Sequence, residues 1–173
     1  LKKIEFFVYK KSYKIIVVTK SFENYLIKNN IPQKKIVLIP NRIDLTKSII
    51  QKANTNLIEK YDLKDKIVFG YVGTVGMAHN IKTIIKAFEI IDINLSNKCK
   101  FLIIGKGAEY EQLFIYTENK KINNVQFCGL INKDELLSYW SVIDLSIIHL
   151  RKIDIFNTVI PTKLIESISF FGG

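Results

Sequence analysis

Ile67-Val-Phe-Gly-Tyr-Val-Gly-Thr-Val-Gly-Met-Ala-His-Asn80 predicts a strand, a glycine-containing turn and the start of a helix. Its first six residues are apolar on both faces, as in a strand that is buried inside a parallel sheet. After this stretch the apolar residues recur at spacings of three and four, which is typical of an amphipathic helix: Ile81, Ile84, Ile85, Phe88 and Ile91. A buried strand that leads directly into a helix is the repeating unit of α/β folds.

The same alternation of short β-branched runs and longer amphipathic segments continues along the chain. Further strands are predicted at residues 15–18, 36–39, 100–104, 124–127 and 144–148, and further helices around 22–26, 109–119, 133–142 and 161–170. Pro161 suits the first position of the last helix, where its missing N–H is not needed. Strands that are apolar on both faces and alternate with helices predict a doubly wound, Rossmann-like parallel sheet of the α/β class.

A polar stretch at residues 41–56 interrupts the alternation and predicts a hinge between two domains. We expect residues 1–45 to be the end of one domain plus the hinge, because two helices and two strands bury too little to form a core alone. Residues 46–173 then form a second domain. The chain stops after a helix, where a doubly wound sheet normally continues into another strand, so we expect both flanks to belong to a longer protein.

The composition, 48 % hydrophobic and 24 % charged over 173 residues, is typical of a folded domain and excludes a disordered chain. No apolar run reaches the roughly 18 residues of a membrane-spanning helix, and residues 1–11 lack a signal-peptide cleavage pattern, so we expect a cytoplasmic protein. Cys99 and Cys128 lie in or beside apolar runs, which favours buried free thiols over a disulfide or a metal site.

Most of the net charge of +10 comes from the N-terminal part of the chain. Lysines alternate there with Phe6, Phe7 and Tyr9, a pattern that fits nucleic acid, an anionic membrane surface or a phosphorylated substrate. It equally fits a lysine-rich composition with no functional demand. Only Arg42 and Arg151 are arginines, and base-reading surfaces favour the bidentate guanidinium, so sequence-specific nucleic-acid binding is disfavoured.

Chemistry in such a fold is expected where strands end and helices begin, because helix N-termini present free amides and partial positive charge to anions. The candidate stretches are residues 73–80, 105–107 and 161–166. Gly73 and Gly76 allow the backbone to approach a ligand closely, although a glycine-rich turn after a strand can equally be structural. The spacing matches neither a dinucleotide fingerprint nor a phosphate-binding loop with Lys-Ser/Thr.

The third stretch places Lys163 in the first turn of a helix and Glu166 one turn further on. A cation in this position is unfavourable to the helix dipole, which indicates an anionic ligand for Lys163. Glu166 can equally be a solvated helix residue. His149 lies within an apolar run, which favours a core position over a catalytic one.

Six runs, in this order, resemble the retaining GT-B glycosyltransferases of family 4, and most closely the bacterial members that build O-antigen and capsule polysaccharide: residues 36–44, 68–80, 101–107, 124–129, 144–148 and 161–166. In that family an N-terminal Rossmann-like domain binds the acceptor and a C-terminal one binds the nucleotide sugar. The resemblance implies that this chain is the tail of the first domain and most of the second. It also implies transfer of a hexosyl or N-acetylhexosaminyl group with retention, from a nucleoside diphosphate sugar, first a UDP-sugar, to a saccharide or lipid-linked acceptor, without a metal or another cofactor.

The resemblance also assigns residue roles. Glu166 matches the second glutamate of the family's Glu-x7-Glu element, which accepts hydrogen bonds from the donor ribose. Gly73 matches the glycine at the leaving phosphate, and Leu130 and Ile131 match the segment along the nucleobase. The expected catalytic residues are Glu166, Lys163 and His79, and the expected substrate-binding residues are Gly73, Thr74, Gly76, Asn80, Gly105, Lys106, Leu130, Ile131, Thr158, Pro161 and Thr162.

The chain departs from the family pattern at four positions, one of which is Asn80, where the family has a glycine. Thr158 stands at the first glutamate of Glu-x7-Glu, while Thr74 and His79 stand at the family's phosphate-binding Arg and Lys. Both permanent cations are therefore missing. We expect the diphosphate to be met by the helix N-terminus near Asn80, by Lys163, and by His79 when it is protonated, with a pKa near about 6.5 for an unperturbed imidazole.

Other functions stay open on the sequence alone. The chain can be a nucleotide-binding module without catalysis, or an inactive fragment; a nucleic-acid-binding domain ranks below both. No residue is a convincing general base, so any base is expected from the acceptor side. The helix around Phe6, Phe7 and Tyr9 is expected at the inner face of the membrane, where lipid-linked acceptors are found, or else packed against another domain.

Overall fold

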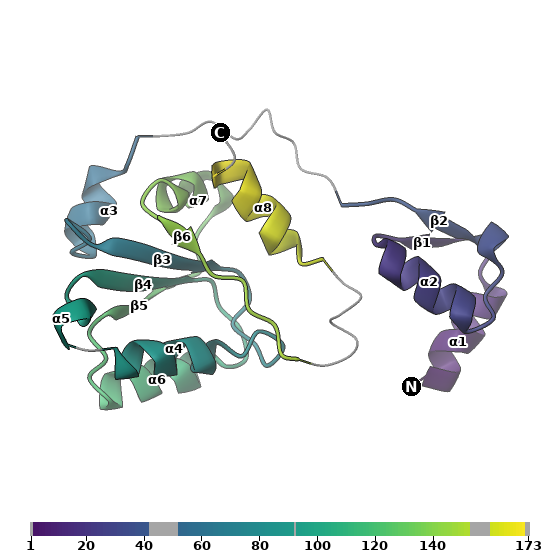
Figure 1. The fold of residues 1–173 in the computed structure, drawn as a ribbon, viewed down its shortest axis with the longest axis horizontal. Coiled ribbons are helices and arrows are strands. Elements are labelled where there is room, and N and C mark those ends of the chain that lie inside the picture. Colours follow the sequence, from purple (N-terminus) through teal and green to yellow (C-terminus); the bar gives the residue numbers. More distant parts are fainter. Residues whose placement is uncertain (1, 42–51, 92, 153–159, 172–173) are drawn as a thin grey trace.

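The computed structural model describes residues 2–41, 52–91, 93–152 and 160–171. These residues form two parallel sheets, one of two strands and one of four (Figure 1). The first sheet pairs β1 (Ile15–Val17) with β2 (Ile36–Leu38); the second has the spatial order β5 (Val125–Gly129), β4 (Cys99–Ile104), β3 (Ile67–Val72) and β6 (Leu145–Ser146). All these strand pairs are parallel, so the predicted α/β class is confirmed.

Helices connect the strands, as parallel crossovers require. They are α1 (Lys2–Lys11), α2 (Lys20–Lys28), α3 (Thr55–Lys60), α4 (Ile81–Ile90), α5 (Ile93–Ser96), α6 (Tyr110–Asn119), α7 (Lys133–Trp140) and α8 (Thr162–Phe171), with a 3₁₀ turn at Gln33–Lys35. In Figure 1, α4 and α6 lie below the four-stranded sheet, whereas α3, α7 and α8 lie above it. The sheet is therefore covered on both faces.

Alternating side chains of β4 fill the two cores beside this sheet. Phe101 and Ile103 pack on the side of α4 and α6, in a cluster that includes Ile85. Leu102 and Ile104 pack on the side of α3 and α7, in a cluster with the buried Trp140. This two-sided burial explains why the strand sequence is continuously apolar instead of alternating.

The helix period explains which side of α1 is buried. Phe6 and Tyr9 pack on the core of the two-stranded sheet. Ile4, Phe7 and Val8 lie at helical spacings of three and four and are 68 %, 61 % and 53 % exposed. Of the three aromatics expected at a membrane or against another domain, Phe6 and Tyr9 thus pack on this small core, and only Phe7 is exposed.

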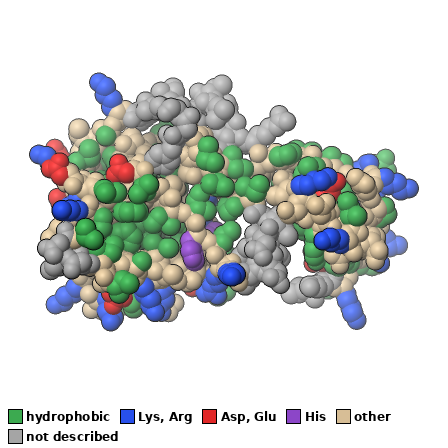
Figure 2. Space-filling view, viewed as in Figure 1, with side chains coloured by type: hydrophobic (Ala, Val, Ile, Leu, Met, Phe, Trp, Pro, Cys, Tyr) green, Lys and Arg blue, Asp and Glu red, His purple; other side chains and the backbone are tan. Residues whose placement is uncertain are grey.

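Basic side chains are widely distributed. On the face shown in Figure 2, Lys and Arg are scattered around both parts of the molecule rather than gathered into one patch. Of the helices within the described ranges, none combines the length and the apolar character needed to cross a bilayer.

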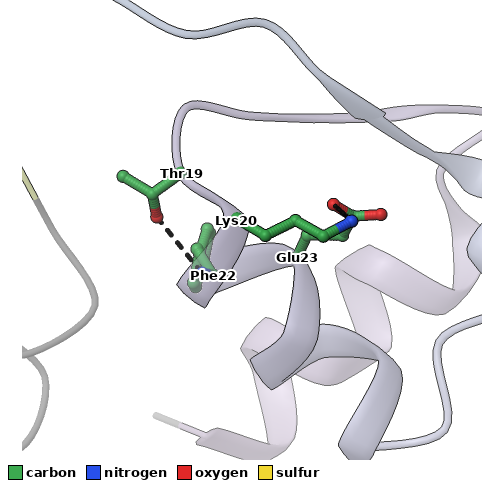
Figure 3. Close-up of polar contacts among 4 residues, drawn as sticks. All are labelled: Thr19, Lys20, Phe22 and Glu23. Carbon is green, nitrogen blue, oxygen red and sulfur yellow. Dashed lines mark hydrogen bonds and ion pairs between the residues drawn. The ribbon is translucent and has the colours of Figure 1, made fainter.

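A polar cap begins α2 and fixes how the chain leaves β1 (Figure 3). The Thr19 hydroxyl accepts a hydrogen bond from the Phe22 N–H at 3.1 Å, which satisfies one of the free amides of the first turn. Lys20 and Glu23 form an ion pair at 2.7 Å on the same turn. The buried Leu26 of this helix then packs on β1.

The predicted strand at residues 67–72 is confirmed without change, and the other predicted elements differ mainly at their ends. β6 is shorter than predicted, because the chain leaves the sheet after the Ile147 N–H donates to the Gly70 carbonyl at 2.7 Å. The short helices α3 and α5 were not predicted, since neither is long enough to display a 3.6-residue period. α8 begins at Thr162, one residue later than expected. Most of the predicted hinge, residues 42–51, lies outside the described residues, and the domain assignment stays a prediction.

Candidate functional site

A cavity of about 340 Å³ opens at the carboxyl ends of β3 and β4, beside the first turns of α8. This is the edge at which parallel α/β sheets bind ligands. All three stretches that the sequence singles out reach it, together with the residues that follow β5. The lining consists of Val72, Gly73, Thr74, Ile104, Gly105, Lys106, Leu130, Ile131, Leu136, Thr162, Lys163 and Glu166.

Two glycines are required where the turns after β3 and β4 meet. Gly105 has φ +132°, and a Cβ on it would lie 2.0 Å from the carbonyl oxygen of Gly73. Gly73 has φ +135°, and a Cβ on it would lie 2.2 Å from Cε of Lys163. Side-chain-bearing residues rarely adopt such φ values. The Lys163 side chain therefore passes directly over the Gly73 backbone.

Backbone hydrogen bonds tie the turns to one another. The Gly73 N–H donates to the Ile104 carbonyl at 2.8 Å, and the Gly105 N–H donates to the Gly129 carbonyl at 2.7 Å. These two amides are thus engaged within the protein. These two amides are therefore not free to bind an anion at the cavity.

The Lys163 Nζ lies in a polar cluster at the edge of the cavity. It donates to the Tyr71 hydroxyl at 2.5 Å and lies 3.2 Å from Nε2 of His79. It also lies 4.4 Å from the centroid of the Tyr71 ring. The Tyr71 hydroxyl donates in turn to the Thr74 carbonyl at 2.6 Å. One cation thus joins α8 to β3 and to the loop after it.

His79 and His149 bond reciprocally across two loops. The His149 Nδ1 lies 2.7 Å from the His79 carbonyl, and the His79 Nδ1 lies 3.4 Å from the His149 carbonyl. Because a carbonyl only accepts, each Nδ1 is the donor of its bond, so Nδ1 carries the proton when the His79 ring is neutral. The His79 Nε2 is then an acceptor and faces the Lys163 ammonium. The sequence favours a core position for His149, but the residue lies half-buried in the loop after β6.

Burial shifts the ionisation of both basic groups in this cluster. Desolvation lowers the pKa of Lys163 to about 8, partly opposed by the negative charge of Glu166. Desolvation, with the neighbouring charge of Lys163, also lowers the pKa of His79 below its usual value. The expectation of an imidazole that charges near pH 6.5 is therefore corrected: His79 is neutral at pH 7, and Lys163 is the group that titrates near physiological pH.

The other lining residues include an acidic, an apolar and a second basic side chain. Glu166 lies three residues after Lys163 on α8 and is exposed at the cavity. Leu130 is 77 % exposed although it is apolar, while Ile131 packs on the core below it. Lys106 stacks over the Tyr110 ring, with Nζ 5.3 Å from its centroid. The cavity thus contains a cation, a carboxylate and the exposed apolar side chain of Leu130.

Several expected site residues lie apart from this lining. Gly76 and Pro161 do not line the cavity, and neither does Asn80, which caps α4 with φ +45° and donates from its side chain to the Thr83 hydroxyl at 2.8 Å. His79 reaches the site only through Lys163. Thr158 lies outside the described residues, so its role stays a prediction.

Neither cysteine takes part in this site. Cys99 is buried and Cys128 is half-buried, and both are free thiols. Burial raises the pKa of Cys128 to about 11, so the thiol is protonated at pH 7. Within the described ranges, no three His, Cys, Asp or Glu side chains form a group that could hold a metal ion.

A larger cavity, of about 440 Å³, lies at the opposite edge of the sheet, where β4 and β5 begin. Its charged lining residues are largely paired with one another: Lys66 with Asp62, and Lys120 with Glu89. The Lys100 ammonium donates to the Asn123 carbonyl. Because parallel sheets bind ligands at the other edge, we place the candidate site at the smaller cavity.

A family model described as glycosyl transferases group 1 matches residues 53–170, more than half of the chain. The chain belongs to this family. Its match covers the four-stranded sheet and the whole cavity lining. The candidate cavity therefore lies within the matched part of the chain, at the sheet edge where parallel α/β sheets bind ligands.

The chain is 23 % identical over 140 residues to the uncharacterized glycosyltransferase MJ1069 of Methanocaldococcus jannaschii, covering 81 % of this chain and 35 % of the relative. Among solved structures it resembles HepE of Anabaena in complex with UDP, with a TM-score of 0.71, 12 % identity and coverage of 92 % and 43 %. It also resembles WaaG, a glycosyltransferase involved in lipopolysaccharide biosynthesis, with a TM-score of 0.72, 14 % identity and coverage of 91 % and 42 %. The chain thus spans less than half the length of these relatives. The structural likeness shows the Rossmann-like GT-B fold.

Sequence reasoning missed two polar residues of the cluster beside this cavity, Tyr71 and His149. Tyr71 carries the one side-chain hydroxyl in the strand 67–72, close to its carboxyl end, and that hydroxyl is the signal that could have identified it. No comparable local signal marks His149, because its contact is with a residue 70 positions away.

Proposed function

We propose that the protein transfers a sugar, with retention at the anomeric carbon and without a metal ion, from a nucleoside diphosphate sugar, first a UDP-sugar, to a hydroxyl group. One observation carries the proposal. The start of α8 places the Lys163 ammonium and the Glu166 carboxylate at one cavity on the carboxyl edge of the sheet. An anionic diphosphate and a ribose with two hydroxyls need this pair of groups.

Each part of the donor then has a counterpart in the cavity. Lys163 binds the diphosphate and stabilises the negative charge that grows on it as the sugar leaves. Glu166 accepts hydrogen bonds from the ribose hydroxyls. The nucleobase lies along Leu130 and Ile131, where apolar surface is exposed. The UDP and UDP-glucose complexes of the Anabaena protein support this class of donor.

The acceptor in this proposal is a saccharide or a lipid-linked saccharide of a surface polysaccharide, and the protein acts in the cytoplasm at the inner face of the membrane. The likeness to WaaG supports this class of pathway. We assign no general base to the described cavity residues, because the cavity offers only Glu166 as a carboxylate and that group binds the ribose.

Calorimetric titration of the chain with UDP, GDP and dTDP tests the donor class. We expect binding of one diphosphate with a Kd below about 1 mM, the usual upper range for enzyme substrates. Release of that diphosphate from its sugar derivative separates a transferase from a nucleotide-binding module without catalysis. Failure of all three diphosphates to bind contradicts the proposal.

Glu166→Gln is expected to weaken UDP binding about fivefold or more. A carboxylate acceptor contributes about 1 kcal/mol more per hydrogen bond than a neutral amide, and the ribose offers two hydroxyls. Uridine retains the ribose, so uridine binding should weaken by the same factor. Glu118→Gln, at the far end of α6, is the matched control. Unchanged UDP affinity by calorimetry removes Glu166 from the site.

The exposed side of α1 predicts contact with an anionic membrane. Ile4, Phe7 and Val8 form one apolar stripe, and Lys3, Lys10 and Lys11 are exposed on the same helix. We expect the chain to co-sediment with phosphatidylglycerol vesicles, and we expect replacement of these three lysines by glutamine to reduce this binding at least tenfold.

The same number of glutamines at Lys64, Lys121 and Lys133, which are exposed on the four-stranded part, serves as the control. If both triple variants bind equally well, α1 is not the membrane contact, and its stripe packs against another domain instead.

A further inference from the structure

We propose that Tyr71 is a positioning residue for the donor diphosphate: its hydroxyl holds the Lys163 ammonium at the edge of the cavity and ties it to the loop after β3. The proposal rests on the proposed function, in which Lys163 binds the diphosphate. Tyr71 does not itself line the cavity, so it acts through Lys163.

The Tyr71 side chain is fully buried, and its hydroxyl contacts polar atoms of two other segments. The residue is 0 % exposed, and its ring belongs to the core between β3, α4 and α6. Its hydroxyl uses its single proton on the Thr74 carbonyl and accepts from Lys163. Both partners belong to the cavity lining. A core residue thus sets the relative position of the cation and the loop.

The ring and the hydroxyl contribute separately. The Lys163 Nζ lies 4.4 Å from the ring centroid, and phenylalanine would keep this ring beside the amine. Only the hydroxyl accepts the hydrogen bond from the ammonium. Tyr71→Phe therefore removes the positioning contact while it preserves the packing and the ring contact.

The groups around the Lys163 amine determine how loss of the Tyr71 hydroxyl changes the pKa of this lysine. Tyr71 faces it from β3, neutral His79 from the following loop and Glu166 from α8, and Lys106 lines the same cavity. Burial already disfavours the charged amine. The Tyr71 hydroxyl accepts from the ammonium and so favours the charged form. Removing it should lower the pKa of Lys163 further.

A purely structural role of the Tyr71 hydroxyl would give a different result in this substitution. If the hydroxyl served only to satisfy the Thr74 carbonyl, Tyr71→Phe would reduce stability without changing the ionisation of Lys163. The titration of the lysine amine therefore distinguishes the two roles independently of any ligand.

The test uses the full chain with ¹³C- and ¹⁵N-labelled lysine. The pH titration of the Lys163 Cε and Nζ signals, assigned with Lys163→Ala, gives the midpoint in the wild type and in Tyr71→Phe. We expect the midpoint to fall by about one pH unit, a tenfold change in the ionisation constant. Tyr61→Phe is the control, since Tyr61 is a buried tyrosine whose hydroxyl bonds the Tyr139 hydroxyl at 3.0 Å in the other core.

Calorimetry on the same variants then separates the positioning role from the role of Lys163. We expect Tyr71→Phe to weaken UDP binding at pH 8 about tenfold and to leave uridine binding unchanged. An unchanged Lys163 midpoint overturns the proposal for Tyr71. A shifted midpoint with unchanged UDP affinity instead shows that Lys163 is not the phosphate ligand, which overturns that part of the proposed function and the positioning role with it.

Discussion

Alanine in place of Lys163 is expected to weaken UDP binding at least tenfold and to leave uridine binding unchanged. A hydrogen bond to a charged group contributes about 1.5 to 3 kcal/mol, and each 1.4 kcal/mol is a factor of ten in affinity. Uridine has no phosphate, so it loses no contact with the amine. Calorimetric titrations of both ligands at pH 7 measure the difference between the two effects.

The same variant should remove a pH dependence. Because the pKa of Lys163 is lowered to about 8, the free protein loses the ammonium between pH 7 and pH 9, and the wild-type affinity for UDP should fall across this window. An anion beside the amine raises its pKa again, so UDP binding at pH 8 should take up a proton. In Lys163→Ala both effects should vanish.

Lys133→Ala is the matched control for this prediction, because Lys133 is exposed in the first turn of α7 and does not line the cavity. It should leave both ligands unaffected. If Lys163→Ala weakens UDP and uridine equally, the lysine is structural, and the phosphate site must be sought at Lys106, which lines the same cavity.

The location of the site could be predicted from the sequence because topology determines it. Once residues 67–72 and 100–104 are recognised as parallel strands, their carboxyl ends must lie at one edge. The turns that contain Gly73 and Gly105 are then neighbours, although 32 positions separate them in the sequence. Strand topology alone does not predict that the first turn of α8 lies at the same edge. That prediction came from the family resemblance.

The polar cluster could not be predicted, because it depends on side-chain directions across elements that are distant in sequence. Tyr71 and Lys163 are 92 positions apart, and His79 and His149 are 70 apart. The run 144–148 suggested a longer strand, whereas the chain turns out of the sheet and brings His149 to the neighbouring loop. Periodicity describes which face a residue occupies and carries no information on such a turn.

The departures from the family pattern acquire a physical meaning in this cluster. The resemblance places a permanent cation at position 79, where this chain has a neutral histidine. The Lys163 Nζ lies 3.2 Å from the Nε2 of that histidine. A lysine of α8 therefore lies beside the position where the resemblance implies a cation on the loop. In our proposal the Tyr71 hydroxyl holds the Lys163 ammonium in this position by a hydrogen bond.

Gly105→Ala is expected to destabilise the four-stranded part of the molecule by about 3 kcal/mol or more. An alanine must adopt φ +132°, a strained conformation that costs roughly 1 to 3 kcal/mol, and its Cβ would lie 2.0 Å from a backbone oxygen of Gly73. A backbone atom cannot rotate away as a flexible side chain can, so the turns after β3 and β4 must separate. Urea denaturation followed by the fluorescence of Trp140, the one tryptophan of the chain, measures the loss in this part.

Gly76→Ala is the matched control for the free energy of unfolding. A Cβ at Gly76 meets only the Thr74 Cγ2, at 3.9 Å, which is ordinary contact. The substitution should therefore change the unfolding free energy by less than about 1 kcal/mol, and the smaller entropy of the unfolded alanine chain opposes even that loss. If Gly105→Ala is as stable as Gly76→Ala, the turns after β3 and β4 are not in contact. The cavity edge that carries Lys163 over Gly73 would then not exist in solution.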